Sequence, residues 1–588
     1  MIRLGAAPSD GGQVTAGTGG STLARPPGFR GAFRLDAPAR AVYAEAAGIQ
    51  QLWPTAVAVP ADADDVVALV RWAARTRTPL TPRGSGSSMA GGAIGSGVVV
   101  DLGGLRELGA IDAQRRRVVA GPGVLRDEVD AAARAAGLRF PVDPSSGAFC
   151  TVGGMAATNA AGAHTLRYGA MRRWVAALDC VFADGTRAVV ARDGPVAEGV
   201  PALDRLHREV VPRLRAADRS TLHHPGVRKD SSGYALADFA ASGDAVDLLV
   251  GSEGTLAIIL GLELSLAPLL PETASLLAAF PTLEAAVGGA AVARAAGTSA
   301  CELLDRTFLD LARSAAAGKG DAAGAARWDG ADAVLLIELE GATSAAVADA
   351  GRALERALHA AGAGEVMLAA DRDAEAALWE LRHAASPALA RLDPALRSMQ
   401  IIEDGAVPPA HLAEYVRGIR MALARHGLRG AIFGHAGDGH VHVNPLIDVR
   451  DAHWRASAAD LLREGVALTT RLGGTLTGEH GDGRLRAGVL AETWGGARSP
   501  AMDLFAAVKR AFDPEGILNP GVKLRRAEPT TGVADPGDPF GAIKYDPSLP
   551  PLPAAARAVL DRVAADRAYA RPRLALLDEV SRTRPDLE

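Results

Sequence analysis

Two short blocks in the second half of the chain carry residue types that bind metal ions. The first, Gly434-His435-Ala-Gly-Asp-Gly-His-Val-His442-Val-Asn444, sets two imidazoles seven residues apart. The second, Gly478-Glu479-His480-Gly481-Asp482-Gly483, adds a carboxylate beside another imidazole. With Glu479, the paired histidines form the ligand set of a catalytic zinc site, which manganese or iron can also occupy. Such a cation polarises hydroxyl and carboxylate groups, so the pattern predicts chemistry on a hydroxy acid.

The geometry that these blocks require is a hairpin. A tight Gly-Asp-Gly turn keeps His435 and His442 off one helical face, whereas the two arms of a hairpin can bring them together. His480 directly follows Glu479 and can face the same cavity, where a neutral imidazole acts as a general base. The alternative is ordinary packing, with satisfied core histidines, a surface glutamate and a histidine held in a glycine loop.

Size and composition favour a soluble globular protein. The chain has 588 residues, of which 48% are hydrophobic and 22% charged, enough for about two or three domains. A net charge of −5 without a Lys/Arg stripe gives no reason to expect a nucleic-acid partner. The widely spaced Cys150, Cys180 and Cys301 argue against disulfides and iron–sulfur clusters. With no signal-peptide core and no long apolar run, we expect a cytoplasmic location.

Four parts of the chain differ in composition. We expect a disordered segment at 1–28, a domain at 29–270, a second domain at 271–525 and an extension at 526–588. In the first domain, short strands (56–60, 98–102) alternate with helices such as 61–72, the pattern of an α+β domain, and 266–271 resembles a linker.

The second domain must position the histidine blocks. Its apolar periodicity predicts an antiparallel sheet covered on one face by helices, with strand, turn and strand over 430–444. A helix at 457–472 then delivers the loop that carries Glu479 and His480. The other expected elements are strands at 275–280 and 333–339 and helices at 283–296, 343–360, 371–392, 411–426 and 553–567.

A glycine-rich loop, Arg83-Gly-Ser-Gly-Ser-Ser88, follows a predicted strand and can present several backbone N–H groups to one anion. It lacks the Gly-Lys-Ser/Thr of the Walker loop and the downstream acid of the dinucleotide fingerprint. Alone, the loop is equally consistent with a plain turn. Further blocks of small residues allow the backbone to approach a large flat ligand, and glycine at bends would explain any one of them but not all: 140–146, 150–155, 159–162, 167–169 and 251–256.

Together these blocks resemble the FAD-binding domain of the vanillyl-alcohol oxidase/p-cresol methylhydroxylase superfamily. The histidine blocks, followed by Asp513-Pro514 and Asn519-Pro-Gly521, resemble the C-terminal domain of its D-lactate, glycolate and D-2-hydroxyglutarate dehydrogenase branch. The resemblance covers about residues 50–523 in motif order and spacing. It implies an α+β fold, in which a two-subdomain FAD-binding domain of the p-cresol methylhydroxylase type precedes an antiparallel-sheet-plus-helices C-terminal domain.

The resemblance implies FAD as cofactor, with residues 83–88 at its pyrophosphate and Asn519 closing on the flavin from the other domain. Some relatives tether FAD through a histidine in the first loop, but this loop has none. Although Cys150 could form a tether, we expect non-covalent FAD. The implied cofactor-binding residues are Arg83, Gly84, Ser85, Gly86, Ser87, Ser88, Pro144, Thr151, Gly154, Met155, Asn159, Tyr168, Glu253, Gly254, Ile258 and Asn519.

The resemblance also implies roles around the metal. His435, His442 and Glu479 would bind a divalent ion (Zn, Mn or Fe), and His480 would take the hydroxyl proton as a hydride leaves for flavin N5. The implied substrate contacts are Arg382 as carboxylate clamp, Ser386 and Asn444.

Two positions depart from the family pattern. His440 replaces the usual Asn and is either an extra ligand or a hydrogen-bond partner of one. Ile401 and Ile402 stand where some relatives place a lysine for a second carboxylate, which favours a monocarboxylic or more apolar substrate.

The predicted activity is therefore oxidation of a D-2-hydroxy acid of the lactate or glycolate kind to the 2-oxo acid. We expect electrons to pass to a separate iron–sulfur subunit, electron-transfer flavoprotein, quinone or cytochrome, which can bring the protein to a membrane surface. A homodimer is a possible assembly. The alternatives are an FAD-dependent oxidase of another alcohol or amine that uses oxygen, and a non-enzymatic FAD-binding subunit that docks a redox partner.

Overall fold

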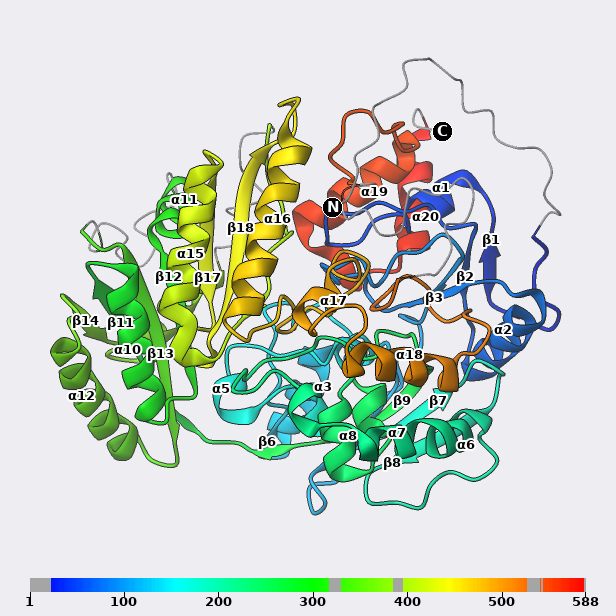
Figure 1. The fold of residues 1–588 in the computed structure, drawn as a ribbon, viewed down its shortest axis with the longest axis horizontal. Coiled ribbons are helices and arrows are strands. Elements are labelled where there is room, and N and C mark those ends of the chain that lie inside the picture. The colour runs from blue at the N-terminus through cyan, green and yellow to red at the C-terminus, as the bar shows by residue number, and fades with distance from the viewer. Residues whose placement is uncertain are drawn as a thin grey trace.

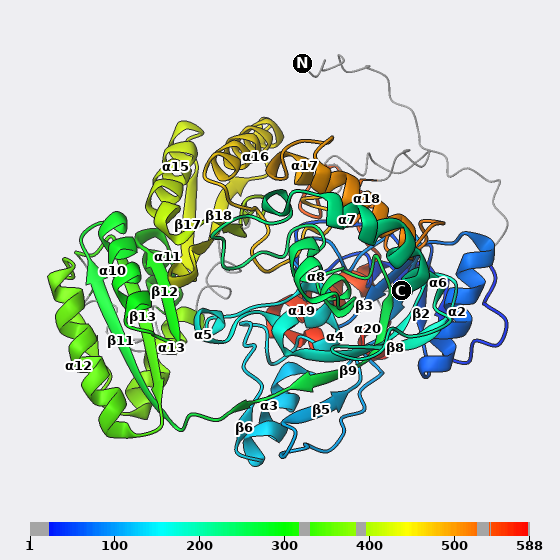
Figure 2. The same ribbon diagram turned by 60° about the horizontal axis from the view of Figure 1, so that its bottom comes forward.

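The computed structural model describes residues 23–316, 328, 330–383, 395–525, 540 and 543–585. Three large sheets organise this part of the chain (Figure 1). In Figure 2 the third sheet lies at the left with α10 (Leu283–Ala295) and α12 (Ser344–Ala360), and the chain that leads into β11 (Glu272–Phe280) joins it to the first two sheets. Of the segment 1–28, only residues from Leu23 onward are described, and there Arg25 donates to the Phe29 carbonyl.

The first sheet contains β1 (Ala32–Arg34), β2 (Ala56–Val59), β4 (Val98–Asp101) and β3 (Leu80–Arg83), in that order. Helices cover both faces of its central strands, so these strands are apolar on both sides. Ala56 and Ala58 face α2 (Ala63–Thr76), which begins where Asp62 accepts hydrogen bonds from the backbone of Asp64 and Asp65.

The opposite face of the first sheet is covered by two helices from the C-terminal end of the chain. Val57 and Val99 pack against α19 (Ala554–Asp566) and α20 (Arg573–Thr583). Figure 1 shows these red helices beside the blue N-terminal strands. The predicted helix at 553–567 is confirmed, but its position against the first sheet was not foreseen.

The second sheet is antiparallel and follows the order β5, β9, β7, β8, with bounds Arg117–Ala120, Ile258–Ser265, Val175–Val181 and Arg187–Ala191. The α4 helix (Val152–Thr158) contacts β9. The predicted linker at 266–271 contains a short strand, β10 (Ala267–Pro268), which pairs with β6 (Leu138–Arg139).

The third sheet runs in the order β14, β11, β13, β12, β17, β18, β15, and all its pairs are antiparallel, as expected. Its strands are β11 (Glu272–Phe280), β12 (Ala300–Asp305), β13 (Ala333–Gly341), β14 (Val366–Leu368), β15 (Leu396–Ser398), β17 (Arg429–Gly434) and β18 (His440–Asp448). The pairing Phe433↔His442 makes β17 and β18 the predicted hairpin.

Helices pack on both faces of the third sheet, so the expectation of one covered face was incomplete. One face carries α10 (Leu283–Ala295), α12 (Ser344–Ala360), α15 (Leu412–Arg425) and α16 (Trp454–Arg471). The other carries α11 (Arg306–Ala316) and α13 (Arg372–His383), because alternate strand residues such as Leu304 and Leu336 are also apolar.

The helix predicted over 371–392 is described as far as His383, and its remaining residues lie outside the described part. None of the described helices combines the length and apolar character that crossing a membrane requires.

Candidate active site

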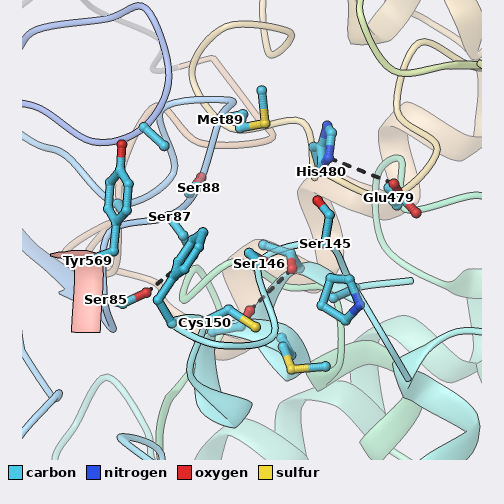
Figure 3. A pocket seen from close by; sticks show the side chains of 18 of the residues that line it. Ser85, Ser87, Ser88, Met89, Ser145, Ser146, Cys150, Glu479, His480 and Tyr569 are labelled. Carbon is cyan, nitrogen blue, oxygen red and sulfur yellow. Dashed lines mark hydrogen bonds and ion pairs between the residues drawn. The ribbon is translucent and has the colours of Figure 1, made fainter. Parts of the chain in front are cut away.

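A cavity of about 1130 Å³ is lined by loops of the first two sheets, by strands of the third sheet and by the C-terminal segment. Figure 3 shows Ser85, Cys150, Glu479 and His480 around it. Most of the predicted site residues meet at this cavity: Arg83, Gly84, Ser85, Gly86, Ser87, Ser88, Pro144, Thr151, Gly154, Met155, Glu253, Gly254, Arg382, His435, His442, Asn444, Glu479 and His480.

The glycine loop after β3 brings backbone close to its neighbours. A side chain at Gly84 would come within 2.3 Å of Thr151 Oγ1, and Gly86 has a φ of +76°. Both positions therefore require glycine. The Ser88 hydroxyl is buried beside the cavity and has no hydrogen-bond partner among the described residues. A narrow loop with an unused polar atom fits the diphosphate of a bound FAD.

Four predicted cofactor residues lie outside the cavity lining: Asn159, Tyr168, Ile258 and Asn519. Asn159 accepts a hydrogen bond from the Arg172 backbone at 2.9 Å, and the Tyr168 hydroxyl donates to Glu340 at 2.5 Å. Asn519 donates to the carbonyls of Gly92 and Glu253, both at 2.8 Å. Ile258 is fully buried at the start of β9. Of these four residues, Asn519 supports the wall directly, because Gly92 and Glu253 both line the cavity.

The three predicted metal ligands converge. Glu479 Oε1 lies 3.1 Å from His435 Nε2 and 3.3 Å from His442 Nε2, and all three side chains are buried. The hairpin places His435 directly after β17 and His442 on β18, and the loop after α16 supplies Glu479. Two imidazole nitrogens and a carboxylate oxygen gathered in this way suit a divalent cation.

Hydrogen bonds at the far side of each ring fix the orientation of both histidines. His435 Nδ1 lies 2.6 Å from Glu302 Oε1, and His442 Nδ1 donates to the Glu403 carbonyl at 3.2 Å. With Nδ1 occupied, both Nε2 atoms are directed at Glu479. Partners of this kind hold metal-ligating histidines in one tautomer and raise their basicity.

Glu479 is held as a carboxylate by a lysine from the first half of the chain. Lys229 Nζ donates to Glu479 Oε2 at 2.8 Å, and Lys229 is 1% exposed. Burial raises the pKa of Glu479, but Lys229 and His435 outweigh it and hold that pKa well below its usual range. A carboxylate metal ligand must be ionised, and this environment keeps Glu479 in that form.

His480 faces the same cavity and is oriented by two acids. Its Nδ1 lies 2.9 Å from both carboxylate oxygens of Glu403, and its backbone N–H donates to Asp404 at 2.9 Å. Its Nε2 lies 3.8 Å from Glu479 Oε1. Burial lowers the pKa of His480, but the charges of Glu403 and Asp404 outweigh it and raise that pKa to about 10.

His440 joins the same group of side chains. Each of four residues offers one atom that could bind a metal ion, and these atoms lie within 4.8 Å of one another: His435, His440, His442 and Glu479. His440 Nε2 donates to Asp404 at 2.9 Å, and burial lowers the pKa of His440 to about 4, so the ring is neutral. Its Nδ1 is buried and has no hydrogen-bond partner among the described residues. A neutral ring with a lone pair still unused is chemically suited to bind a cation.

The structure describes two of the three predicted substrate-binding residues. Arg382 on α13 donates from Nε to Glu302 at 2.7 Å, and its guanidinium lies 5.2 Å from the Phe433 ring. Asn444 Oδ1 accepts a hydrogen bond from the Ser398 hydroxyl at 2.8 Å. Both residues line the cavity. Ser386 lies outside the described residues.

Three of the positioning groups were not predicted from the sequence: Glu302, Glu403 and Lys229. Glu302 had a readable signal, because a fully buried strand such as Ala300-Cys-Glu-Leu-Leu-Asp305 carries a carboxylate only when it is paired. Glu403 and Asp404 had a weaker signal as two adjacent acids after an apolar pair. Nothing local marks Lys229.

Two protein-family models match this chain. Residues 54–191 match the family model described as an FAD binding domain, and residues 270–522 match FAD linked oxidases, C-terminal domain. A D-lactate dehydrogenase of Archaeoglobus fulgidus is 30% identical over 477 residues, 80% of this chain and 91% of that protein. The glycolate oxidase subunit GlcD of Bacillus subtilis is 31% identical over 477 residues, 80% of this chain and 89% of that protein.

The fold has its own parallel among solved structures. The structure of p-cresol methylhydroxylase with substrate bound superimposes with a TM-score of 0.60 at 13% identity, over 85% of this chain and 95% of that one. This likeness confirms the expected two-part α+β architecture. Together with the family matches and the relatives above, it shows that the chain belongs to the family of FAD-linked oxidases and dehydrogenases that share the p-cresol methylhydroxylase fold.

Proposed function

We propose that this protein oxidises a D-2-hydroxy acid of the lactate or glycolate kind to the 2-oxo acid, using FAD, a divalent metal ion and His480 as base. The observation that carries the proposal is the convergence of His435, His442 and Glu479 at the wall of the cavity that the glycine loop also lines. The names of the two relatives, a D-lactate dehydrogenase and a glycolate oxidase subunit, support the substrate class.

When bound, FAD would accept a hydride and the divalent cation would act as a Lewis acid. Residues 83–88, with Thr151 and Glu253 nearby in the lining, would hold the cofactor. Arg382 would bind the substrate carboxylate through its terminal nitrogens, because its Nε is engaged by Glu302. Asn444 would contact the substrate beside it.

His480 would take the hydroxyl proton at Nε2. Its Nδ1 is directed at Glu403, which fixes the ring and leaves Nε2 toward Glu479 and the cavity. With a pKa of about 10, the ring by itself is protonated at neutral pH. Positive charge at Glu479 would lower this pKa, because a nearby cation disfavours the imidazolium.

The electrons would leave through a separate acceptor. The chain has three cysteines, all of them buried and free, and they lie too far apart in sequence to suggest a cluster motif. An iron–sulfur subunit, an electron-transfer flavoprotein, a quinone or a cytochrome would serve. A cytoplasmic location, with the acceptor at a membrane surface, and assembly as a homodimer complete the proposal.

A substrate panel tests the proposal. Purified protein is mixed anaerobically with D- and L-2-hydroxy acids, and loss of the visible flavin absorbance is followed. We expect bleaching by a D-2-hydroxy acid that is abolished by a chelator and restored by a divalent metal. His480→Ala should slow bleaching by about 10²–10⁴-fold, whereas His453→Ala, at an exposed position, should not. Peroxide formation from another alcohol or an amine, unaffected by chelators, would overturn it.

A further inference from the structure

The C-terminal segment lies outside both family matches, the second of which ends at residue 522. Its described part, residue 540 and residues 543–585, contains α19, the 3-10 helix η7 (Ala568–Ala570) and α20. Leu560 on α19 and Leu576 on α20 belong to the same buried cluster as Val57 and Val99 of the first sheet. The segment is therefore an integral part of the first domain's core.

This segment also forms part of the cavity wall. Its lining residues are Lys544, Tyr545, Ala564, Ala565, Arg567 and Tyr569. The Tyr569 ring stacks on Phe149 with centroids 5.2 Å apart and planes inclined by 30°. The guanidinium carbon of Arg567 lies 4.8 Å from the centroid of the Phe149 ring. Figure 3 shows Tyr569 and Ser85 across the cavity from Glu479 and His480.

A buried arginine ties this wall to the glycine loop. Arg573 is 3% exposed and donates from Nη2 to the Ser85 carbonyl at 3.1 Å. Its Nη1 donates to the carbonyls of Ala568 and Arg571, so the same side chain also holds the turn that carries Tyr569. The position of the wall is thus coupled to the loop assigned to the cofactor.

Arg567 has an unusual backbone for a residue with a long side chain. It ends α19 in the left-handed region, at a φ of +52°, where glycine is the favoured residue. Its guanidinium lies in the cavity wall over an aromatic ring, which is where a bound anion or ring system would meet it.

We propose that residues 543–585, which lie outside both family matches, form part of the FAD site, and that Arg567 and Tyr569 hold the cofactor there. A guanidinium can bind phosphate oxygens or stack on a ring, and a tyrosine offers a flat face and a hydroxyl. This inference requires FAD as cofactor, but it does not depend on the metal, on His480 or on the substrate.

Titration of the apoprotein with FAD tests the inference. The test variants are Arg567→Gly and Tyr569→Leu, and the control is Arg571→Ala, an exposed residue of the same segment outside the cavity lining. We expect each test variant to raise the dissociation constant of FAD by about tenfold, with a faster release of FAD on dilution. The control should match the wild type.

Melting temperatures of the apoproteins separate a local effect from misfolding. Glycine relaxes the backbone at a φ of +52°, so Arg567→Gly should melt no lower than the wild type. Folded Arg567→Gly and Tyr569→Leu proteins that bind FAD as tightly as the control would overturn the inference. Because no substrate is added, the result is independent of the proposed activity.

Discussion

His435 Nδ1 lies 2.6 Å from Oε1 of Glu302 in a fully buried position. The second oxygen of the same carboxylate accepts a hydrogen bond from Arg382 Nε at 2.7 Å. One glutamate therefore joins the histidine proposed to bind the metal to the arginine proposed to bind the substrate. Burial raises the pKa of Glu302, but His435 and Arg382 outweigh it, and the net shift is downward. Glu302 thus stays ionised between its two partners.

Replacement of this carboxylate by an amide should weaken metal binding. Glu302→Gln keeps the shape of the side chain but removes its negative charge. That charge makes the His435 ring more basic and therefore a stronger metal ligand, so we expect metal affinity to fall by about 10–100-fold. Competition with a chromogenic chelator measures the metal affinity of each variant. Glu414→Gln, at an exposed position on α15, is the matched control. Equal metal affinity in the two variants would contradict the role assigned to Glu302.

Arg382→Lys should damage substrate binding more than it damages the fold. A lysine keeps the charge but loses the planar fork, so it cannot serve Glu302 and a substrate carboxylate together. We expect KM for the best 2-hydroxy acid to rise by about tenfold or more. Arg372→Lys, at the exposed start of the same helix, is the control. A KM unchanged by Arg382→Lys would remove Arg382 from the substrate site.

Flavin should be released completely when the wild-type protein is denatured. Cys150 lines the cavity, but burial raises the pKa of its thiol to about 11, so little reactive thiolate exists at neutral pH. After acid precipitation, we expect all flavin absorbance in the supernatant, both for the wild type and for Cys150→Ala. A yellow pellet that disappears in Cys150→Ala would show a covalent bond instead.

Stability should depend on pH through His224. Its Nδ1 lies 2.8 Å from Asp230 Oδ2 and its Nε2 lies 3.1 Å from the Thr493 carbonyl, contacts that favour the doubly protonated ring. Burial lowers the pKa of His224, but Asp230 outweighs it and the pKa is raised. A raised folded-state pKa stabilises the fold fully below about pH 6.5, and this stabilisation is lost as pH rises through the folded-state value.

The Asp230 carboxylate sets the acid limit of the same pair. Burial raises its pKa, but His224 outweighs it and the pKa is lowered, so its contribution is present above about pH 3.9 and is lost in acid. We therefore expect His224→Phe to lower Tm more at pH 6 than at pH 9. Thermal melts of both proteins across this range measure the difference. A Tm difference that is constant or grows with pH would refute the assignment.

Local patterns were sufficient for most elements. The apolar alternation around the Gly-Asp-Gly turn predicted the hairpin of β17 and β18, and the glycine loop lies between two strands as expected. Such features follow from periodicity and turn chemistry within about 10–20 residues. The same pattern predicted that His435 and His442 converge across the hairpin, because their separation and the turn leave few other arrangements.

The groups that tune these histidines could not be read in this way. Glu302 is brought beside His435 by the pairing of Leu303 with Gly434, and Lys229 reaches Glu479 across 250 residues of sequence. Strand order and domain packing are decided by the whole chain, because many local patterns are compatible with any one strand. The three proposed metal ligands were therefore predictable from the sequence, but the residues that surround them were not.

The C-terminal segment shows the same difference between what local sequence determines and what the folded chain determines. Its apolar periodicity was enough to predict the helix that became α19, because helical spacing is a local property. That this helix covers Val57 and Val99, and that the turn after it reaches the cavity lined by the glycine loop, was decided only in the folded chain. A strand that is apolar on both faces must be covered on both, but the strand does not specify which helix covers it.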